Sequence, residues 1–202
     1  MKTNQLKNTQ KTNRSVLVKI VITAMLSAVA FVLFLFEFPI IPGASHLKLD
    51  LSDIPALLCS LVCGPVWGVA TQLLKNVIEL LVKGLGTQMG FGNMMDFIAG
   101  CMWILPFTLI FNALIKKEMK KPVAVTIAGI IAIAVRVVVG IGANYLIDPL
   151  FFKYFMNIVL DSKTLWAAIW SATAINAIKG VMLTIVAYPI VLGLLDKLKK
   201  FR

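Results

Sequence analysis

The chain has 202 residues, of which 59% are hydrophobic and only 14% are charged, and its formal net charge is +11. No soluble globular domain needs so much apolar surface, so we expect one integral membrane domain and no attached soluble domain. The excess of positive charge does not indicate a nucleic-acid partner, because most basic residues gather at three places between apolar runs.

Residues 1–15 form a polar, basic segment ahead of the first apolar run. That run is long enough to cross a bilayer and lacks the small-residue cleavage site of a signal peptide, so we expect it to be retained as a span. We expect residues 1–15 to be a cytoplasmic tail that is disordered or lies on the membrane surface. Residues 16–202 are then a single membrane domain.

The apolar runs predict an all-α integral membrane protein with six transmembrane helices. The expected spans are 16–38, 51–63, 66–82, 91–115, 123–147 and 164–195. Six crossings put both termini and the basic cluster after the fourth span on one face, which the positive-inside rule makes cytoplasmic. A five-span count, without the short second run, would split the basic clusters between the two faces. The sequence therefore predicts a multi-pass protein of the cell membrane.

Small residues in the first span indicate a helix-docking face. Ala24 and Ala28 lie one turn apart and allow another helix to approach closely. Ser27 and Ala30 are expected to widen this flat patch.

Polar residues within the apolar spans indicate a binding pocket. Asn176 and Lys179 lie on one face of the last span, and a lysine there costs at least a few kcal/mol unless it has a partner or a water-filled cavity. Asp96 and Asn144 fall about one turn from the outer ends of their spans. Because such groups face the bundle interior, we expect a pocket that opens to the outside and is closed below by apolar side chains.

Three further charges leave alternatives open. Lys75 and Glu79 are four residues apart, so they form either an ion pair on the helix face or part of the site. Arg136 is the one notable polar residue in the inner half of the spans. With so little polar lining there, we expect no continuous conduit.

The three outer loops carry different signals. The loop at 39–50 is unusually apolar and is expected to fold over something, whereas the loop at 83–92 is rich in glycine without the Walker spacing. Glycine there indicates close backbone approach to a ligand or a mobile gate. In the third loop, at 148–163, Phe151 and Phe152 are expected at the membrane interface.

Amides and one amine suit a flat, neutral or weakly acidic organic molecule, whereas a metal ion would require more carboxylates or histidines. The three cysteines lie in apolar runs and are expected to be inert thiols. His46 is the single histidine, and no G-x-S-x-G or H-E-x-x-H motif occurs. We therefore predict no catalytic residues, no metal site and no enzymatic activity.

Several segments together resemble a known family. The order of spans, Asn144, and the segments FPIIPGASHLKLDLSDIPALL, GFGNMMDFIAG and INAIKG are similar to the riboflavin-binding S components of energy-coupling factor (ECF) vitamin transporters. The resemblance covers nearly the whole chain beyond the basic tail. It implies a six-helix protein that captures riboflavin from outside as a transported ligand, with no cofactor. The implied partners are a membrane coupling subunit, which Ala24 and Ala28 would contact, and two ABC ATPases.

The resemblance also implies roles for individual residues. Asn144, Asn176 and Lys179 would hold the edge of the isoalloxazine ring, and the first outer loop would cover the ligand. The full expected substrate-binding set is Asn144, Asn176, Lys179, Asn93, Asp96, Leu47, Lys48, Leu49, Phe91 and Met94. Asp96 departs from the asparagine expected at its position.

Two alternatives remain open at this stage. The alternatives to a riboflavin-binding S component are an S component for another vitamin and a self-sufficient secondary carrier or channel. Arg136 and the Lys75–Glu79 pair are the best support for a carrier or channel. An intramembrane enzyme lacks any recognisable catalytic set.

Overall fold

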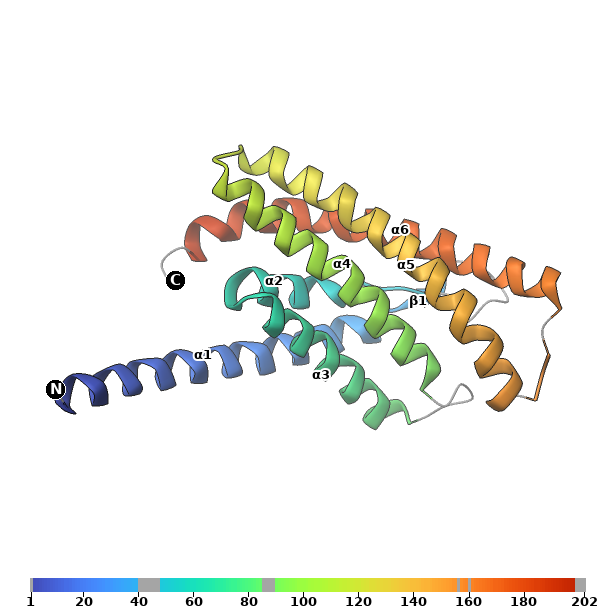
Figure 1. Cartoon of the computed structure of the whole chain (residues 1–202), viewed down its shortest axis with the longest axis horizontal. Coiled ribbons are helices and arrows are strands. Elements are labelled where there is room, and N and C mark those ends of the chain that lie inside the picture. The colour runs from blue at the N-terminus through green and yellow to red at the C-terminus, as the bar shows by residue number, and fades with distance from the viewer. Residues whose placement is uncertain (1, 40–47, 85–89, 156, 160, 199–202) are drawn as a thin grey trace.

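The structure is a computed structural model that describes residues 2–39, 48–84, 90–155, 157–159 and 161–198. Its helices are α1 (Lys2–Leu35), α2 (Asp53–Cys63), α3 (Pro65–Lys83), α4 (Phe91–Lys116), α5 (Lys121–Phe155) and α6 (Ser162–Leu198). A two-residue antiparallel ladder joins β1 (Phe38–Pro39) to β2 (Lys48–Leu49) between α1 and α2. The prediction of an all-α bundle is confirmed (Figure 1).

Four helices in the described part of the chain are long and apolar enough to cross a membrane, rather than the expected six. They are α1 from Ser15 onward, α4, α5 and α6. Helix α2 has 11 residues and is only about 16 Å long, too short for a straight crossing. Nine of its residues are buried, so α2 is an internal helix enclosed by the others.

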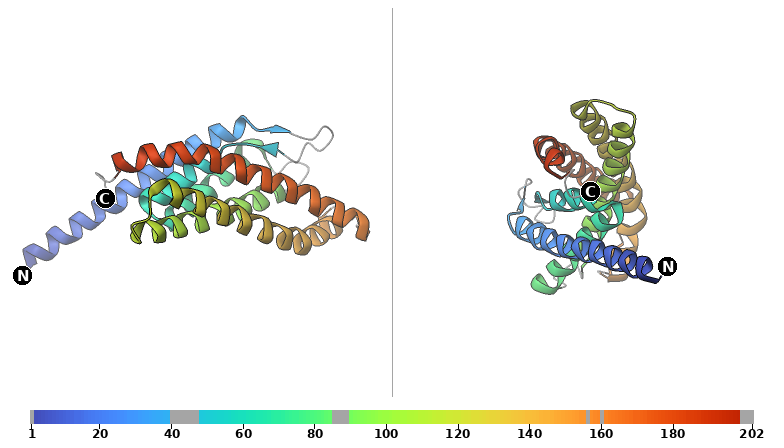
Figure 2. Two further views of the ribbon diagram at one scale, coloured as in Figure 1. Left: turned by 90° about the horizontal axis from the view of Figure 1, so that it is seen from above. Right: turned by 90° about the vertical axis from the view of Figure 1, so that its left-hand side faces the viewer.

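Helix α1 starts at Lys2, so residues 2–15 are helical and the expectation that they are disordered is wrong. No proline or glycine occurs between Lys2 and Leu35, and nothing therefore interrupts the backbone hydrogen bonds of the helix. The start of α1, the end of α6 and the connection between α4 and α5 all lie toward the same end of the bundle (Figures 1 and 2).

Helices α2 and α3 form a tight hairpin, as the Gly64-Pro65 pair predicts. Gly64 has φ 112°, a conformation that favours glycine, and Pro65 occupies the first turn of α3. The hairpin packs between α1 and α4, and α2 also contacts α6. Its burial places the N-terminal end of α2, with Asp53, deep in the protein.

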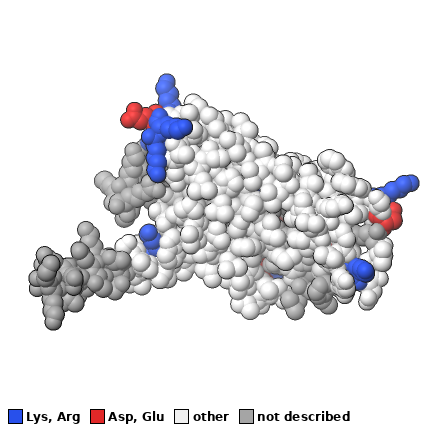
Figure 3. Space-filling view, viewed as in Figure 1, with Lys and Arg blue, Asp and Glu red and all other residues white. Residues whose placement is uncertain are grey.

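The core lies where α2, α4, α5 and α6 meet. Leu57, Trp103, Phe107, Ala128 and Leu183 are all completely buried there. Charged residues are almost absent from the middle of the surface and gather toward its two ends, as one face shows in Figure 3. This distribution is what a bilayer requires of a protein that it surrounds.

Helix α5 continues eight residues beyond the expected end at Ile147 and includes Pro149. The third outer loop therefore begins after Phe155, not at Asp148. Asp161 precedes α6 and accepts hydrogen bonds from the Thr164 hydroxyl and from the Lys163 N–H at 3.2 Å. These bonds hold the pKa of the Asp161 carboxyl below its usual range.

Close packing of the α2–α3 hairpin gives the first prediction. A Cβ at Gly68 would collide with the Ser60 side chain and lie 3.0 Å from the Ala56 carbonyl oxygen. We expect Gly68→Ala to lower the midpoint of thermal unfolding in detergent, because overpacking costs about 1–3 kcal/mol. Gly142→Ala is the matched control, since a Cβ there meets nothing within 4 Å, and it should be neutral or stabilising. Equal midpoints for both variants would contradict the close approach of α2 and α3.

Candidate ligand-binding site

A cavity of about 430 Å³ lies between α4, α5 and α6. Its volume is within the range of about 300–1,000 Å³ that small-molecule sites occupy. Helix α5 contributes Arg136, Gly140, Asn144 and Asp148 at intervals of four residues, which form a stripe along one helical face. This stripe extends for about 18 Å along the helix, so the cavity is elongated.

The cavity exists because several residues that line it have small side chains. Helix α6 faces it with Ala168 and Ala172, and α5 with Gly140 and Ala143. A Cβ at Gly140 would lie 3.5 Å from Nδ2 of Asn176, so these two residues sit at the same level of the bundle. Bulkier residues at these positions would fill the space instead of lining it.

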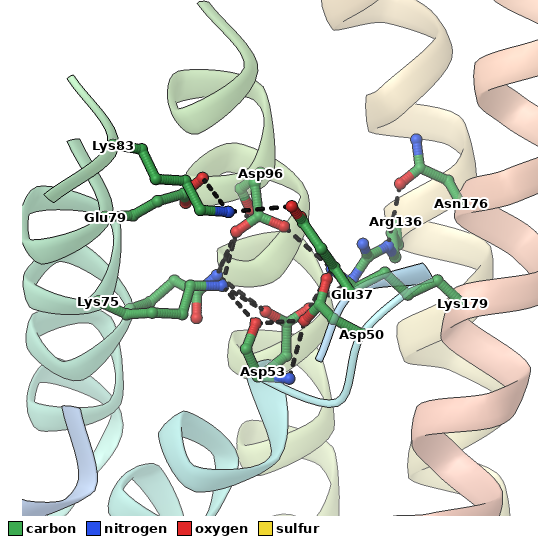
Figure 4. Close-up of polar contacts among 12 residues, drawn as sticks. Glu37, Asp50, Asp53, Lys75, Glu79, Lys83, Asp96, Arg136, Asn176 and Lys179 are labelled. Atoms are coloured by element: carbon green, nitrogen blue, oxygen red, sulfur yellow. Dashed lines mark hydrogen bonds and ion pairs between the residues drawn. The ribbon is translucent and has the colours of Figure 1, made fainter. Parts of the chain in front are cut away.

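A cluster of buried charges lies at the end of the cavity nearer the hydrophobic core, which we call its inner end. Figure 4 shows the contacts within this cluster. Asp53, at the start of α2, is completely buried and accepts hydrogen bonds from Lys75 at 3.1 Å, Arg136 at 3.1 Å and Gln72 at 3.0 Å. The N-terminus of α2 adds a favourable positive dipole to this carboxylate. Asp53 thereby joins α2, α3 and α5.

Two more carboxylates complete the cluster. Asp96 binds Lys75 at 2.6 Å and Lys179 at 3.0 Å, and Asp50 binds Lys179 at 2.8 Å. Three carboxylates thus face three cations, so the cluster is formally neutral. We call these six residues the buried charge cluster: Asp50, Asp53, Lys75, Asp96, Arg136 and Lys179.

The inner end of the cavity is lined partly by charged side chains, whereas we expected apolar side chains alone. Apolar side chains alone were expected below the polar groups, but Arg136 and Lys179 line the inner end together with Met102. The hydrophobic core begins beyond this level, with Trp103 and Leu183 completely buried. A neutral set of paired charges therefore separates the cavity from the core.

The cavity brings together five of the ten expected substrate-binding residues. They are Asn144, Asn176, Lys179, Asp96 and Phe91. Asn93, Met94 and Leu49 do not line it: Asn93 donates to the Asn76 carbonyl oxygen at 3.5 Å, and Met94 is 43% exposed. Leu47 and the side chain of Lys48 lie outside the described residues.

Asn144 and Asn176 differ in their partners. Oδ1 of Asn176 accepts a hydrogen bond from Nε of Arg136 at 3.2 Å, which fixes the orientation of the amide. Asn144 is 5% exposed and has no hydrogen-bond partner among the described residues. Its amide is therefore available to a ligand.

Lys75 and Glu79 do not form the ion pair that their spacing suggested. Lys75 points into the buried charge cluster, whereas Glu79 lies 3.9 Å from Lys83. Lys83 also binds Glu37 at 2.9 Å and lies 4.1 Å from the ring centroid of Phe34. These contacts form a separate group of charges that ties α3 to the end of α1 (Figure 4).

Phe151 faces the cavity and not the membrane interface at which we expected it. It is 7% exposed, lines the cavity and stacks on Phe91 with 4.1 Å between ring centroids. Phe152 lines the cavity beside it. The additional turns of α5 explain the difference, because they carry both rings back into the bundle.

One face of α1 is exposed and the opposite face is buried. Ala24 and Ala28 are exposed, as a docking face requires. Ser27 and Ala30 do not widen that patch, because both are buried. The Ser27 hydroxyl donates to the Thr23 carbonyl oxygen of its own helix at 2.8 Å and lies 3.4 Å from the Thr71 carbonyl oxygen of α3. Thr23 lies on the same inner face, 3.4 Å from the Cys59 sulfur.

Sequence reasoning missed three acidic residues in the cavity wall or in the charge cluster beside it. Asp50 and Asp53 belong to the buried charge cluster, and Asp148 lines the outer part of the cavity. A signal was present for each, since a carboxylate within or beside an apolar segment is costly and indicates a function. Asp53 lies within the short apolar run expected at 51–63, and Asp148 begins the loop expected at 148–163.

The chain is similar to known membrane transport proteins. The sequence model of the family described as ECF transporter, substrate-specific component, matches residues 18–191. Riboflavin transporter FmnP of Bacillus subtilis (strain 168) is 32% identical over 170 residues, which cover 83% of this chain and 87% of that protein. Riboflavin transporter RibU of Staphylococcus aureus (strain TCH60) is 33% identical over 172 residues, covering 83% and 85%.

A solved structure is similar as well. The S component of a bacterial ECF transporter superimposes with a TM-score of 0.66 at 27% identity, covering 90% of this chain and 97% of that one. Together with the four apolar helices, these similarities identify a multi-pass membrane protein.

The buried charge cluster gives the second prediction. Asp53→Asn removes a negative charge that Lys75 and Arg136 share, and uncompensated buried cations cost about 3–5 kcal/mol. We therefore expect a large fall in the thermal unfolding midpoint of the purified protein. Glu118→Gln, an exposed carboxylate in the turn after α4, is the matched control and should leave the midpoint unchanged. An Asp53→Asn protein as stable as this control would show that the cluster does not hold the bundle together.

Proposed function

The chain belongs to the family of substrate-specific components of ECF transporters, and we propose that it binds riboflavin from outside the cell for uptake by partner subunits. The curated relatives FmnP and RibU are named as riboflavin transporters. The observation that carries the proposal is the set of amide and ammonium donors at the inner end of one elongated cavity.

The donors fit the oxygen- and nitrogen-rich edge of a flavin ring. Lys179 has three N–H donors, and its bonds to Asp50 and Asp96 occupy two of them. The third donor, the unpartnered amide of Asn144 and the amide nitrogen of Asn176 are then available to ring carbonyls and nitrogens. Because the buried charge cluster is formally neutral, these donors favour a neutral ligand over an anion.

The walls fit the flat body of the same ligand. Phe91 and Phe151 stack at the outer part of the cavity, and Met95, Ile98 and Ile175 supply apolar surface along its length. A tricyclic ring can displace water from such walls at a gain of about 25 cal/mol per Å² of buried apolar area. We further propose that the first outer loop covers the bound ligand; residues 40–47 of that loop lie outside the described part of the chain.

The proposed topology has six membrane segments with both termini in the cytoplasm. The α2–α3 hairpin supplies the second and third segments, even though α2 is too short to cross by itself. Support comes from the basic clusters near the start of α1, at the α4–α5 connection and near the end of α6. These three places lie toward the same end of the bundle. Residues 1–15 then form a basic cytoplasmic extension, and residues 16–202 the membrane domain.

We propose that α1 docks on a membrane coupling subunit through Ala24 and Ala28, and that two ABC ATPases supply the energy. The small exposed side chains allow close helix contact. A self-sufficient carrier has lost its main support, because Arg136 and Lys75 are bound in ion pairs with Asp53. An S component for a different vitamin would be revealed by the titration described next.

The third prediction tests the ligand. The purified chain should bind riboflavin more tightly than other vitamins, and Asn144→Ala should weaken binding by about 1–3 kcal/mol, because a buried ligand group loses its partner. Asn144 has no hydrogen-bond partner in the described part of the chain, so the thermal midpoint should not fall. Asn112→Ala, on α4 away from the cavity, is the matched control. A wild-type protein that ignores riboflavin but binds another vitamin would refute the proposed substrate.

The fourth prediction tests docking. The double variant Ala24→Leu and Ala28→Leu should bind riboflavin normally but lose uptake in cells that contain the partner subunits, because the added bulk separates the helices. Exposed alanines of α6 provide the control: Ala167→Leu with Ala174→Leu should retain uptake. If uptake survives in the α1 variant, the docking face lies elsewhere.

A further inference from the structure

Asp148 is a buried carboxylate without a partner. It is 7% exposed, lines the cavity, and has no hydrogen bond or ion pair among the described residues. The carboxylates of the buried charge cluster, by contrast, each contact at least one cation at 3.1 Å or less. A buried acidic group without compensation is costly and is retained where it acts on a ligand.

The position of Asp148 defines which part of a ligand it meets. It lies one turn outward from Asn144 on the same stripe of α5, and about 12 Å along the helix from Gly140, where Asn176 sits. The amide and ammonium donors occupy the inner end of the cavity. The hydroxylated chain of a flavin is attached to N10 of the central ring, between the polar edge and the opposite end of the ring system. When the polar edge binds the inner donors, this flexible five-carbon chain starts from the middle of the cavity and is long enough to extend along α5 to the level of Asp148.

An ionised carboxylate only accepts hydrogen bonds, and it repels other anions. Hydroxyl groups satisfy it, whereas a phosphate group would bring a second negative charge into the same low-dielectric space. Unpaired buried polar groups and like-charge contacts are the strongest means by which a site rejects a wrong ligand.

We propose that Asp148 is a specificity-determining residue that accepts hydrogen bonds from the hydroxyl-bearing side chain of the flavin and selects against flavins phosphorylated on that chain. This inference rests on the proposed function, because it assumes that the ring binds at the Asn144–Asn176 end. It adds a contact that neither the sequence reasoning nor the comparisons assign.

The experiment compares three probes on the full-length protein in detergent or nanodiscs. The probes are riboflavin, lumiflavin, which has a methyl group in place of the hydroxylated chain, and flavin mononucleotide, which carries a phosphate. For Asp148→Ala we expect the riboflavin affinity to fall about 10- to 100-fold and the lumiflavin affinity to change less than about twofold. The thermal midpoint should not fall, because Asp148 has no partner to lose among the residues that the structure describes.

Asp148→Asn tests the effect of the negative charge by itself, because asparagine has nearly the same shape as aspartate. Its amide keeps an acceptor for hydroxyls but loses the negative charge. The ratio of the Kd for the mononucleotide to the Kd for riboflavin should therefore fall at least about tenfold. Asp161→Asn, an exposed carboxylate outside the cavity, is the matched control and should leave all three affinities unchanged.

The possible results are distinguishable. Equal losses of riboflavin and lumiflavin in Asp148→Ala, or an unchanged preference in Asp148→Asn, would overturn the role of Asp148 while leaving riboflavin binding intact. A wild-type protein that binds none of the three flavins would instead overturn the proposed function itself.

Discussion

The ion pairs of Asp53 are the constraint on which the site depends. Each charge of the buried charge cluster would be expensive by itself, and only mutual contact makes the group tolerable inside a membrane. The cations and carboxylates come from α2, α3, α4, α5, α6 and the segment after β2. Satisfying all of them at once fixes the relative positions of five helices. The inner end of the cavity is therefore rigid because the electrostatics allow few other arrangements.

This rigidity has a chemical consequence for recognition. Lys179 and Asn176 are held in place by Asp50, Asp96 and Arg136, so their remaining donors point in fixed directions before a ligand arrives. Pre-organised donors lose little conformational entropy on binding, which raises affinity without extra contacts. Because the cluster carries no net charge, the site can offer ammonium and amide donors to a neutral molecule without favouring anions.

The sequence predicted the helical class and the convergence of Asn144, Asn176 and Lys179, since these follow from hydropathy and helical spacing. It could not predict the partners of Lys75 and Arg136, because Asp53 and Asp96 lie on other helices and no local spacing encodes such pairings. It also could not show that α2 is enclosed by the other helices, because burial by protein and burial by lipid leave the same apolar pattern. The fifth span was expected to end at Ile147, whereas α5 continues to Phe155, and the early end hid the place of Asp148 and Phe151 in the cavity.

Helix α1 stands apart from the cavity, and this separation matters for coupling. Its outer face carries Ala24 and Ala28, while Ser27 on its inner face contacts Thr71 of α3. No member of the buried charge cluster comes from α1, yet Lys75 lies on α3, one turn beyond Thr71. Helix α1 thus contacts the helix that carries Lys75, and the Phe34 ring of α1 lies 5.8 Å from the Lys75 ammonium. Since Lys75 compensates both Asp53 and Asp96, the position of α3 against α1 bears directly on the charge balance of the cluster.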